Sequence, residues 1–195
     1  MKSAPKSAPK SVPSDREPRL YEFSLEIDAG AMTDALLDRL YESGCDDGVP
    51  VARAGRVWVA FVRESTSMAD AVLSALGDLR SAGRRVIGAD LGNLVTLAEI
   101  ARRIDRSRET VSKYASGGRG PGRFPRPAVQ ASRQATVFYW GEVADWLADA
   151  ELVDARTAAD ARQADAISGL QRYRGKLTKT DLREIGRRGR GRRAV

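Results

Sequence analysis

The chain has 195 residues and a net charge of +7, and it contains one cysteine and no histidine. This composition excludes an intrachain disulfide, a Cys/His zinc site and any catalytic triad that needs histidine. Hydrophobic residues make up 42% of the chain, which allows a buried core. No apolar run reaches about 18 residues, the length that a membrane-spanning helix needs, so we expect no membrane partner.

The charge is divided into blocks along the chain. Lys plus Arg minus Asp plus Glu is +3 over residues 1–19, −5 over 20–90, +4 over 91–147, −3 over 148–169 and +8 over 170–195. Blocks of this kind favour a polyanionic partner. The single cysteine and the lack of an apolar leader predict a cytoplasmic protein, and the polyanionic partner makes it a candidate for association with the nucleoid.

Residues 1–19 repeat Lys-Ser-Ala/Val-Pro, with proline at every fourth position from Pro5 to Pro13. Proline at that spacing blocks both helix and sheet, so we expect a disordered, extended basic tail. Such a tail is either a solvated leader or a source of weak attraction to DNA.

Residues 20–90 alternate between strand and helix patterns. The order strand-helix-strand-strand-helix-strand predicts a ferredoxin-like domain. The predicted elements are a strand over 20–27, a helix over 31–43, strands over 49–53 and 57–63, a helix over 66–82 and a strand over 84–90. Asp46 and Asp47 lie beside Cys45 between two glycines, a pattern typical of turns, and we assign no metal site there.

The strand over 57–63 is apolar on both faces, so we expect the face away from the helices to be covered as well. A second copy or the next domain is one candidate cover, because exposed apolar patches mark contacts. A small ligand is another. A third is RNA, with strand aromatics stacking on bases, but Glu22 and Glu26 on that face oppose phosphate.

Residues 91–150 hold the most specific pattern. Thr96 followed by Glu99 is a capping box that begins a helix, and Ser107 caps the start of a second helix. Asp105 lies where the chain must turn, and aspartate tolerates the left-handed conformation. This predicts a helix-turn-helix with a polar outer face, the alternative being an ordinary helical hairpin. The residues expected to face inward are Leu97, Ile100, Ala101, Ile104, Val111 and Tyr114.

In a helix-turn-helix the second helix enters the major groove, with its N-terminal residues at the base edges. Arg108 and Lys113 can donate to guanine, Glu109 can accept from a cytosine amine, and Ser112 can do either. Arginines of the first helix are better placed for phosphate. The candidate DNA-binding residues of this helix pair are Arg102, Arg103, Arg106, Ser107, Arg108, Glu109, Ser112 and Lys113.

The glycines and prolines over 117–125 end the second helix and begin an extended excursion. A short strand over 136–139 and a helix from 141 follow, which completes the order of a winged helix. Within that last helix Val143, Trp146 and Leu147 are expected to face inward. The arginines expected to line the wing and to reach DNA backbone or minor groove are Arg119, Arg123, Arg126 and Arg133.

These motifs, above all SRETVSKY, RGPGRFP and the Trp140–Leu147 pattern, carry a resemblance over roughly residues 20–147. The chain resembles the winged helix-turn-helix of excisionases and MerR-type regulators. More closely, it is similar to actinobacterial proteins that place a domain with a Gly-Cys-Asp-Asp loop before such a module. The resemblance implies sequence-specific DNA binding, usually by dimers, in control of transcription or of mobile elements.

Residues 151–173 have helix-forming composition and a thin apolar stripe. They form either a dimerisation helix, as in MerR-type proteins, or a solvent-exposed helix. Residues 174–195 are expected to form an unfolded basic tail that adds phosphate contacts, with Arg188, Arg190 and Arg192 as candidates. Specific readout of an AT-rich minor groove and RNA contact are the alternatives.

The sequence therefore predicts an α+β DNA-binding protein with an N-terminal ferredoxin-like domain, a winged helix-turn-helix and disordered basic tails. We expect a homodimer that binds double-stranded DNA as a transcriptional regulator, with a small ligand or protein as a further candidate partner of the N-terminal domain. The alternatives are an architectural factor, such as an excisionase-like or segregation protein, and an antitoxin-type interaction protein. No cofactor and no enzymatic activity are expected, because the acidic residues do not form a spaced cluster that could hold Mg²⁺.

Overall fold

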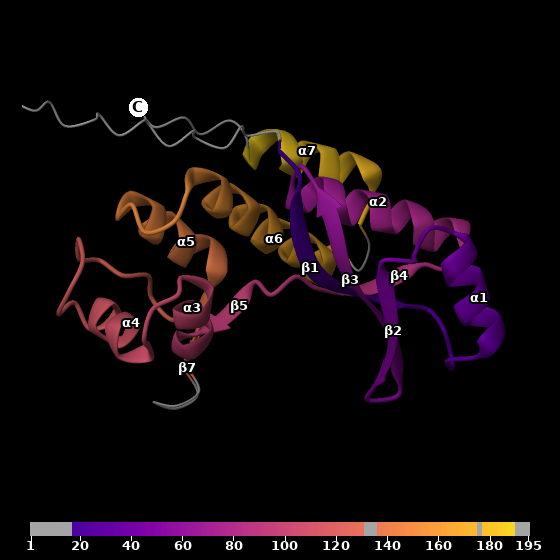
Figure 1. Ribbon diagram of the computed structural model, residues 1–195, viewed down its shortest axis with the longest axis horizontal. Coiled ribbons are helices and arrows are strands. Elements are labelled where there is room, and N and C mark those ends of the chain that lie inside the picture. Colours follow the sequence, from indigo (N-terminus) through magenta and orange to yellow (C-terminus); the bar gives the residue numbers. More distant parts are fainter. Residues whose placement is uncertain (1–16, 131–135, 175–176, 190–195) are drawn as a thin grey trace, which may run out of the picture.

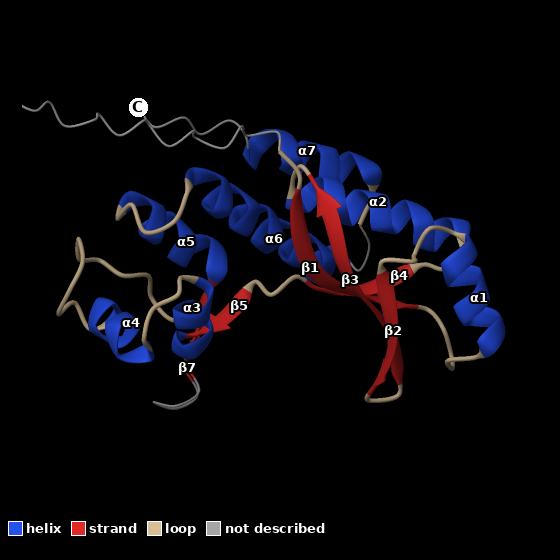
Figure 2. Cartoon of the chain, in the orientation of Figure 1, coloured by secondary structure: helices blue, strands red, loops and turns tan. Residues whose placement is uncertain are grey.

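A four-stranded antiparallel sheet forms the N-terminal half of the computed structural model, which describes residues 17–130, 136–174 and 177–189. Its order is β2-β3-β1-β4, and every neighbouring pair of strands is antiparallel. The mixed α+β class and the predicted order of elements are confirmed (Figures 1 and 2). The elements are β1 (Arg19–Ile27), α1 (Asp34–Glu42), β2 (Gly48–Arg53), β3 (Arg56–Ser65), α2 (Met68–Ser81) and β4 (Val86–Asp90).

Strand alternation sets which face of this sheet is buried. On β1 the odd-numbered residues from Tyr21 to Ile27 are buried, and Phe23 stacks on Phe61 of β3 with ring centroids 5.3 Å apart. Leu40 of α1 and Leu79 of α2 belong to the same core. Both helices therefore cover one face, while the opposite face of β2 and β3, which we expected to be covered, is open among the described residues.

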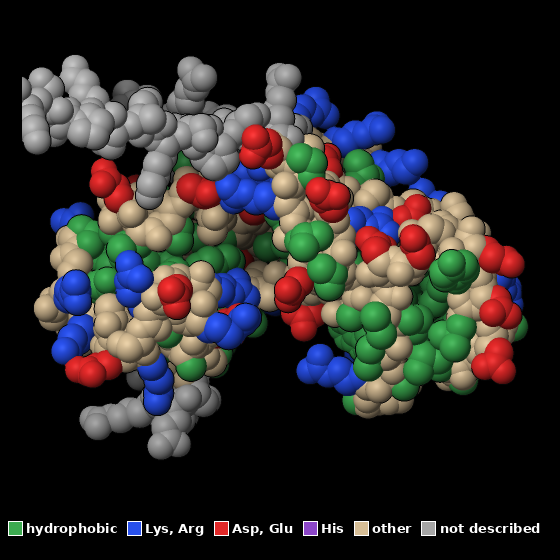
Figure 3. All heavy atoms as spheres, viewed as in Figure 1, with side chains coloured by type: hydrophobic (Ala, Val, Ile, Leu, Met, Phe, Trp, Pro, Cys, Tyr) green, Lys and Arg blue, Asp and Glu red, His purple; other side chains and the backbone are tan. Residues whose placement is uncertain are grey.

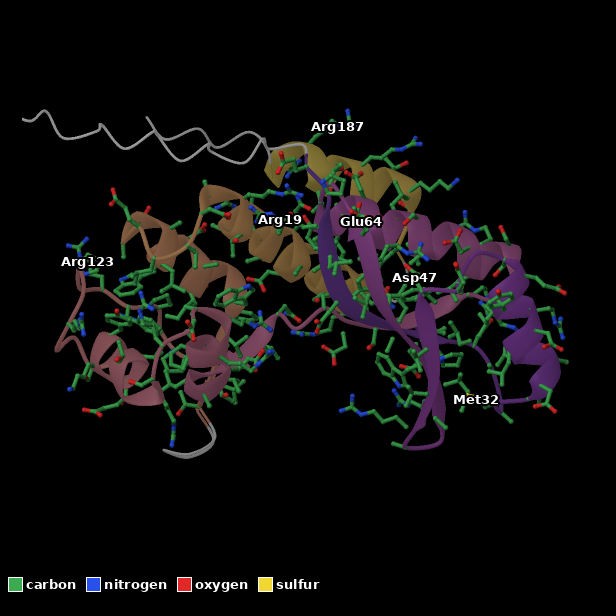
Figure 4. The ribbon with its side chains drawn as sticks, in the orientation of Figure 1. Arg19, Met32, Asp47, Glu64, Arg123 and Arg187 are labelled. Carbon is green, nitrogen blue, oxygen red and sulfur yellow. The ribbon has the colours of Figure 1, made fainter. Side chains whose placement is uncertain are left out.

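A buried arginine ties the loop after α1 to the sheet. Arg63 of β3 donates to both carboxylate oxygens of Asp47 at 2.7 Å and to Asp78 of α2 at 2.6 Å. Burial alone lowers an arginine pKa, but these two carboxylates raise the pKa of Arg63 instead. Asp47 (labelled in Figure 4) is thus part of a structural ion-pair network.

The second half contains a small sheet and three short helices around its own core. The three-stranded sheet has the order β5-β7-β6. Ile100, Val111, Val143 and Leu147 are fully buried between its helices. The elements are β5 (Leu94–Thr96), α3 (Leu97–Arg103), α4 (Arg108–Ala115), β6 (Val129–Gln130), β7 (Thr136–Tyr139) and α5 (Trp140–Asp149).

α6 (Ala155–Arg174) joins the two halves. Ala158 and Ala161 pack into the second core, whereas Ala164 and Ile167 pack into the first. The prediction of a solvent-exposed helix over 151–173 is therefore wrong. Dimerisation through this helix stays a prediction; of its apolar stripe, Ile167 is buried within the chain, whereas Tyr173 is 91% exposed. Small alanine side chains let the helix approach both cores closely, so its surface looks thinly apolar in sequence.

Hydrogen bonds attach α6 to both halves of the molecule. Tyr21 donates to Asp160 at 2.8 Å, and the backbone N–H of Ala69 donates to Gln163 at 2.9 Å, which attaches α6 to the first half. The N–H of Gly141, in the first turn of α5, donates to Asp165 at 2.9 Å on the other side. Burial raises the pKa of Asp165 to about 6.

α7 (Lys179–Gly189) lies against α2 and α6 (Figure 1). Leu182 is 1% exposed, and Ile185 and Leu177 are buried in the same core. The prediction of an unfolded tail from residue 174 is thus wrong for residues 179–189. Leu182 and Ile185 are spaced to face one side of a helix. The high charge of the residues around them favoured the prediction of an unfolded tail instead.

Candidate nucleic-acid interface

The helix pair α3 and α4 begins with the capping predicted from sequence. Thr96 accepts a hydrogen bond from the N–H of Glu99 at 3.2 Å. The carboxylate of Glu99 does not return to the cap, however, but accepts from Arg102 at 2.7 Å and from Arg103 at 3.0 Å. These two guanidinium groups lower the pKa of Glu99 to about 2. Only half of the capping box is therefore formed, and the other half becomes an ion-pair cluster on α3.

The turn between α3 and α4 has the predicted left-handed residue. Asp105 has φ of 51°, and the N–H of Arg106 donates to the carbonyl of Ala101 at 2.9 Å. Ser107 then caps α4 by accepting from the N–H of Thr110 at 3.1 Å. The turn is fixed by backbone bonds at both ends, which sets the angle at which α4 leaves α3.

α4 separates a buried side from a polar side. Val111 is fully buried, and Tyr114 is 4% exposed against Trp146 of α5, with ring centroids 5.3 Å apart. The exposed side carries Arg108, Glu109, Ser112 and Lys113, as predicted. An ion pair of 2.8 Å joins Lys113 to Glu109 across one turn of this side. At such an exposed position the pair contributes little stability and leaves both groups accessible to a ligand.

The two arginines of α3 have different environments. Arg102 is exposed over 73% of its side chain, whereas Arg103 is exposed over 24%. Arg103 donates to the carbonyl of Gly92 at 2.9 Å, and its guanidinium lies 4.8 Å from the ring centroid of Trp140. These interactions use donors and the planar face of Arg103 to hold α3 against α5, so Arg103 is less available to a ligand than Arg102, and a phosphate contact stays a prediction for both.

The glycine-rich segment after α4 is a packed loop over residues 116–128. Trp146 of α5 donates its indole N–H to the carbonyl of Gly122 at 2.7 Å. Phe124 packs edge-on against Trp146 at 5.0 Å and against Phe138 at 5.5 Å. A Cβ at Gly120 would lie 2.7 Å from the Trp146 ring, so only glycine allows this approach. A buried indole N–H requires a hydrogen-bond acceptor. The inward position predicted for Trp146 therefore indicated in the sequence that some acceptor must pack against it.

The arginines assigned to the wing are distributed over this loop and its end. Arg119 and Arg123 are exposed on the loop that precedes the hairpin of β6 and β7, and their role on a wing stays a prediction. Arg123, which Figure 4 labels at the end of the second half, has φ of 53° and points outward. Arg126 is exposed just before β6, and Arg133 lies outside the described residues.

The remaining candidates are Arg106, Ser107 and the C-terminal arginines. Arg106 is exposed and donates to the carbonyl of Asp105 at 2.9 Å, beside Ser107 at the start of α4. Arg188 is exposed on α7, where it pairs with Glu184. Because α7 packs on α2 and α6, Arg188 is not brought together with α4. Arg190 and Arg192 lie outside the described residues.

The candidates that remain exposed on α3, the turn, α4 and the loop are mostly cationic. We call this set the α4 surface, and it consists of Arg102, Arg106, Ser107, Arg108, Glu109, Ser112, Lys113, Arg119, Arg123 and Arg126. Basic side chains at this end of the molecule are visible in Figure 3.

Comparisons with protein-family models, with curated proteins and with solved structures each found no match. Over residues 17–130, 136–174 and 177–189, no group of three or more His, Cys, Asp or Glu side chains could hold a metal ion. In the same stretches no helix combines the length and the apolar character needed to cross a bilayer.

Proposed function

We propose that this protein binds double-stranded DNA in a sequence-specific manner and regulates transcription as a homodimer. The single observation that supports this function best is α4, which buries Val111 and Tyr114 and presents Arg108, Glu109, Ser112 and Lys113 to solvent. Those four side chains supply the donors and acceptors that distinguish base pairs in a major groove.

We further propose that the two halves are a ferredoxin-like domain and a winged helix-turn-helix. The strand order β2-β3-β1-β4 supports the first assignment. The capped α3 and α4, followed by the β6–β7 hairpin and α5, support the second. In this account the protein acts by occupying a DNA site in the cytoplasm and catalyses no reaction.

The loop over 116–128 supports the same proposal because its arginines are held on a fixed support. Gly122 is bonded to Trp146, and Phe124 packs on the same ring, so the backbone between Arg119 and Arg123 is tied to α5. Arginines presented from a rigid loop can contact phosphates beside the groove that α4 enters, which adds affinity without base readout.

A mobility-shift assay with a selected duplex and a scrambled competitor tests the proposal. The double variant Arg108→Ala, Lys113→Ala should lose roughly 10- to 100-fold of the preference for the selected duplex, since each base contact is worth about 1–3 kcal/mol. The control variant Arg39→Ala, Arg80→Ala removes the same charge from exposed positions of the first half and should keep the preference. Equal preference in all three proteins would show that α4 does not read sequence.

A further inference from the structure

The open side of the four-stranded sheet carries an apolar surface on β2 and β3. The register places Val49 beside Ala60 and Val51 beside Trp58, with Val62 further along β3. Val49 is 64% exposed and Val62 is 51% exposed. Figure 3 shows hydrophobic side chains gathered over β2 and β3 on the face toward the viewer. We call these five residues the open sheet face; no described helix or strand covers them, and contiguous exposed apolar patches mark interaction sites.

The exposed edge of β2 is poorly suited to pairing with a further strand. The carbonyl of Asp47 accepts from the N–H of Val62, so alternation along β2 directs the hydrogen-bonding groups of residues 48, 50 and 52 away from β3. Residue 50 is proline, which has no N–H to donate. A strand added at this edge would therefore lack its central donor, as in natural sheets that avoid edge pairing. A partner at this side of the molecule must use the face instead.

The charges that flank the open sheet face differ at its two ends. At the hairpin end, Arg53 of β2 pairs in register with Arg56 of β3. At the other end, Glu64 lies opposite Leu20, and Glu22 lies opposite Val62. Glu26 lies between the ends, but it is buried and paired with Arg56 at 3.3 Å. The face therefore runs from a basic end through an apolar middle to an acidic end.

This arrangement is complementary to itself. When two copies of the face meet about a two-fold axis with their strands antiparallel, the basic end of each copy opposes the acidic end of the other. A two-fold interface requires that one patch match itself in this way. A second copy of the chain already carries the acidic and basic ends in the complementary order, whereas a partner of another sequence would have to supply both.

We propose that the chain forms a homodimer by packing the open sheet faces of two copies together. β3 has 10 residues, and three strands at about 4.8 Å spacing give each copy on the order of 500 Å² of contact. That is below the roughly 800 Å² per partner of a standard interface, so we expect a dimer that dissociates on dilution. The proposal can be tested apart from DNA binding, because none of the five residues of the open sheet face belongs to the α4 surface.

Sedimentation of the full chain without DNA tests the proposal. Over roughly 1 μM to roughly 500 μM the wild-type protein should pass from monomer to dimer. Val62→Asp and Val49→Asp should each weaken the dimer at least about tenfold, because a charge would be buried without a partner. Val129→Asp changes a residue of similar exposure, 54%, in the other half and should leave dimerisation unchanged. A wild-type chain that stays monomeric throughout, or two face variants that dimerise like wild type, would overturn the proposal.

Charge exchange gives a second, independent test at exposed positions. Arg53→Glu places an acid at the basic end, and Glu64→Arg places a base at the acidic end, so residues 53 and 64 of opposing copies carry like charges and each variant alone should dimerise several-fold more weakly than wild type. Mixed together, the two variants should form a heterodimer tighter than either homodimer, because every acidic end then meets a basic end. A mixture no tighter than its components would rule out the antiparallel face-to-face arrangement.

Discussion

α4 and α7 are both short cationic helices, and each turns two apolar residues three positions apart into the fold. In α4 these are Val111 and Tyr114, and in α7 they are Leu182 and Ile185. The helices differ in what surrounds them. α4 follows a capped helix and a fixed turn, whereas α7 packs its apolar side onto α2 and α6.

The exposed sides of the two helices also differ in chemistry. α4 presents an acid, a hydroxyl and two cations, a mixture that can both donate to base edges and accept from them. α7 also exposes an acid and a hydroxyl, Glu184 and Thr180, but its exposed side is mainly Lys and Arg, which can neutralise phosphates without reading sequence. Neither positive charge nor the mixture of donors and acceptors therefore identifies a base-reading helix by itself; the clearest difference between the two helices is the scaffold that presents them.

The largest expected effect concerns α7 as a structural helix. Leu182→Ala should lower the free energy of unfolding by about 3 kcal/mol, because it leaves a cavity in the first core. Urea unfolding measures this change. Thr180→Ala, at an exposed position of the same helix, is the control and should change stability little. A negligible change in the free energy of unfolding for Leu182→Ala would contradict the packing of α7 and support the unfolded tail expected from its charge.

The support of the loop beside α4 can be broken at one glycine. Gly120 has φ of 90°, and its Cβ would meet the Trp146 ring, so Gly120→Ala should cost about 2 kcal/mol. Freed from α5, the loop should become sensitive to proteolysis, and DNA affinity should fall several-fold. Gly118→Ala has room at 3.7 Å from its neighbours and should change neither property. Equal behaviour of the two variants would show that loop anchoring does not matter for binding.

Arg102 and Arg103 form a matched pair that separates affinity from stability. Arg103→Ala should cost about 1.5 kcal/mol of stability, because it removes the contacts with Trp140 and Gly92. Arg102→Ala should leave stability nearly unchanged but reduce the slope of log affinity against log salt by about one phosphate contact. Thermal unfolding and salt titrations of binding measure the two effects. The opposite pattern would exchange the roles assigned to these arginines.

The smallest effect is the pH dependence of α6. Because the pKa of Asp165 is raised from 3.8 to about 6, the folded state favours its protonated form. The stability from this group is therefore fully present below about pH 4 and is lost as pH rises through about 6. Asp165→Asn should stabilise the protein by about 1 kcal/mol at pH 7.5, allowing for partial exposure, and should flatten the profile between pH 4 and 6. Asp149→Asn, at an exposed position, should leave the profile as in wild type.

The capped helices α3 and α4 and the turn between them could be predicted because their signals are local. Thr96 and Ser107 cap their helices through bonds to residues three positions away, and Asp105 adopts its left-handed conformation between them. The strands of the first half were equally readable, since burial alternates along β1 and β3. These features depend on neighbours in sequence, so a single chain suffices to predict them.

The features that were missed depend on distant partners. Trp146 bonds to Gly122 from another element, and Arg103 finds Gly92 and Trp140 only after folding. Ala164 and Leu182 reach a core formed mainly by residues 21–91, which composition could not indicate. Charge therefore led to the prediction of an unfolded tail over residues 179–189, which tertiary packing holds in a helix.

The most direct test of the central claim is selection of bound sequences from random duplex DNA, carried out in parallel with wild type and with Arg108→Gln. Arg108 lies at the exposed start of α4, where the first base contacts of such a helix are made. The account predicts a defined consensus for wild type and a change at one or two adjacent positions for the variant, with the remaining positions kept. An identical consensus from both proteins, or no consensus from wild type, would contradict base reading by α4.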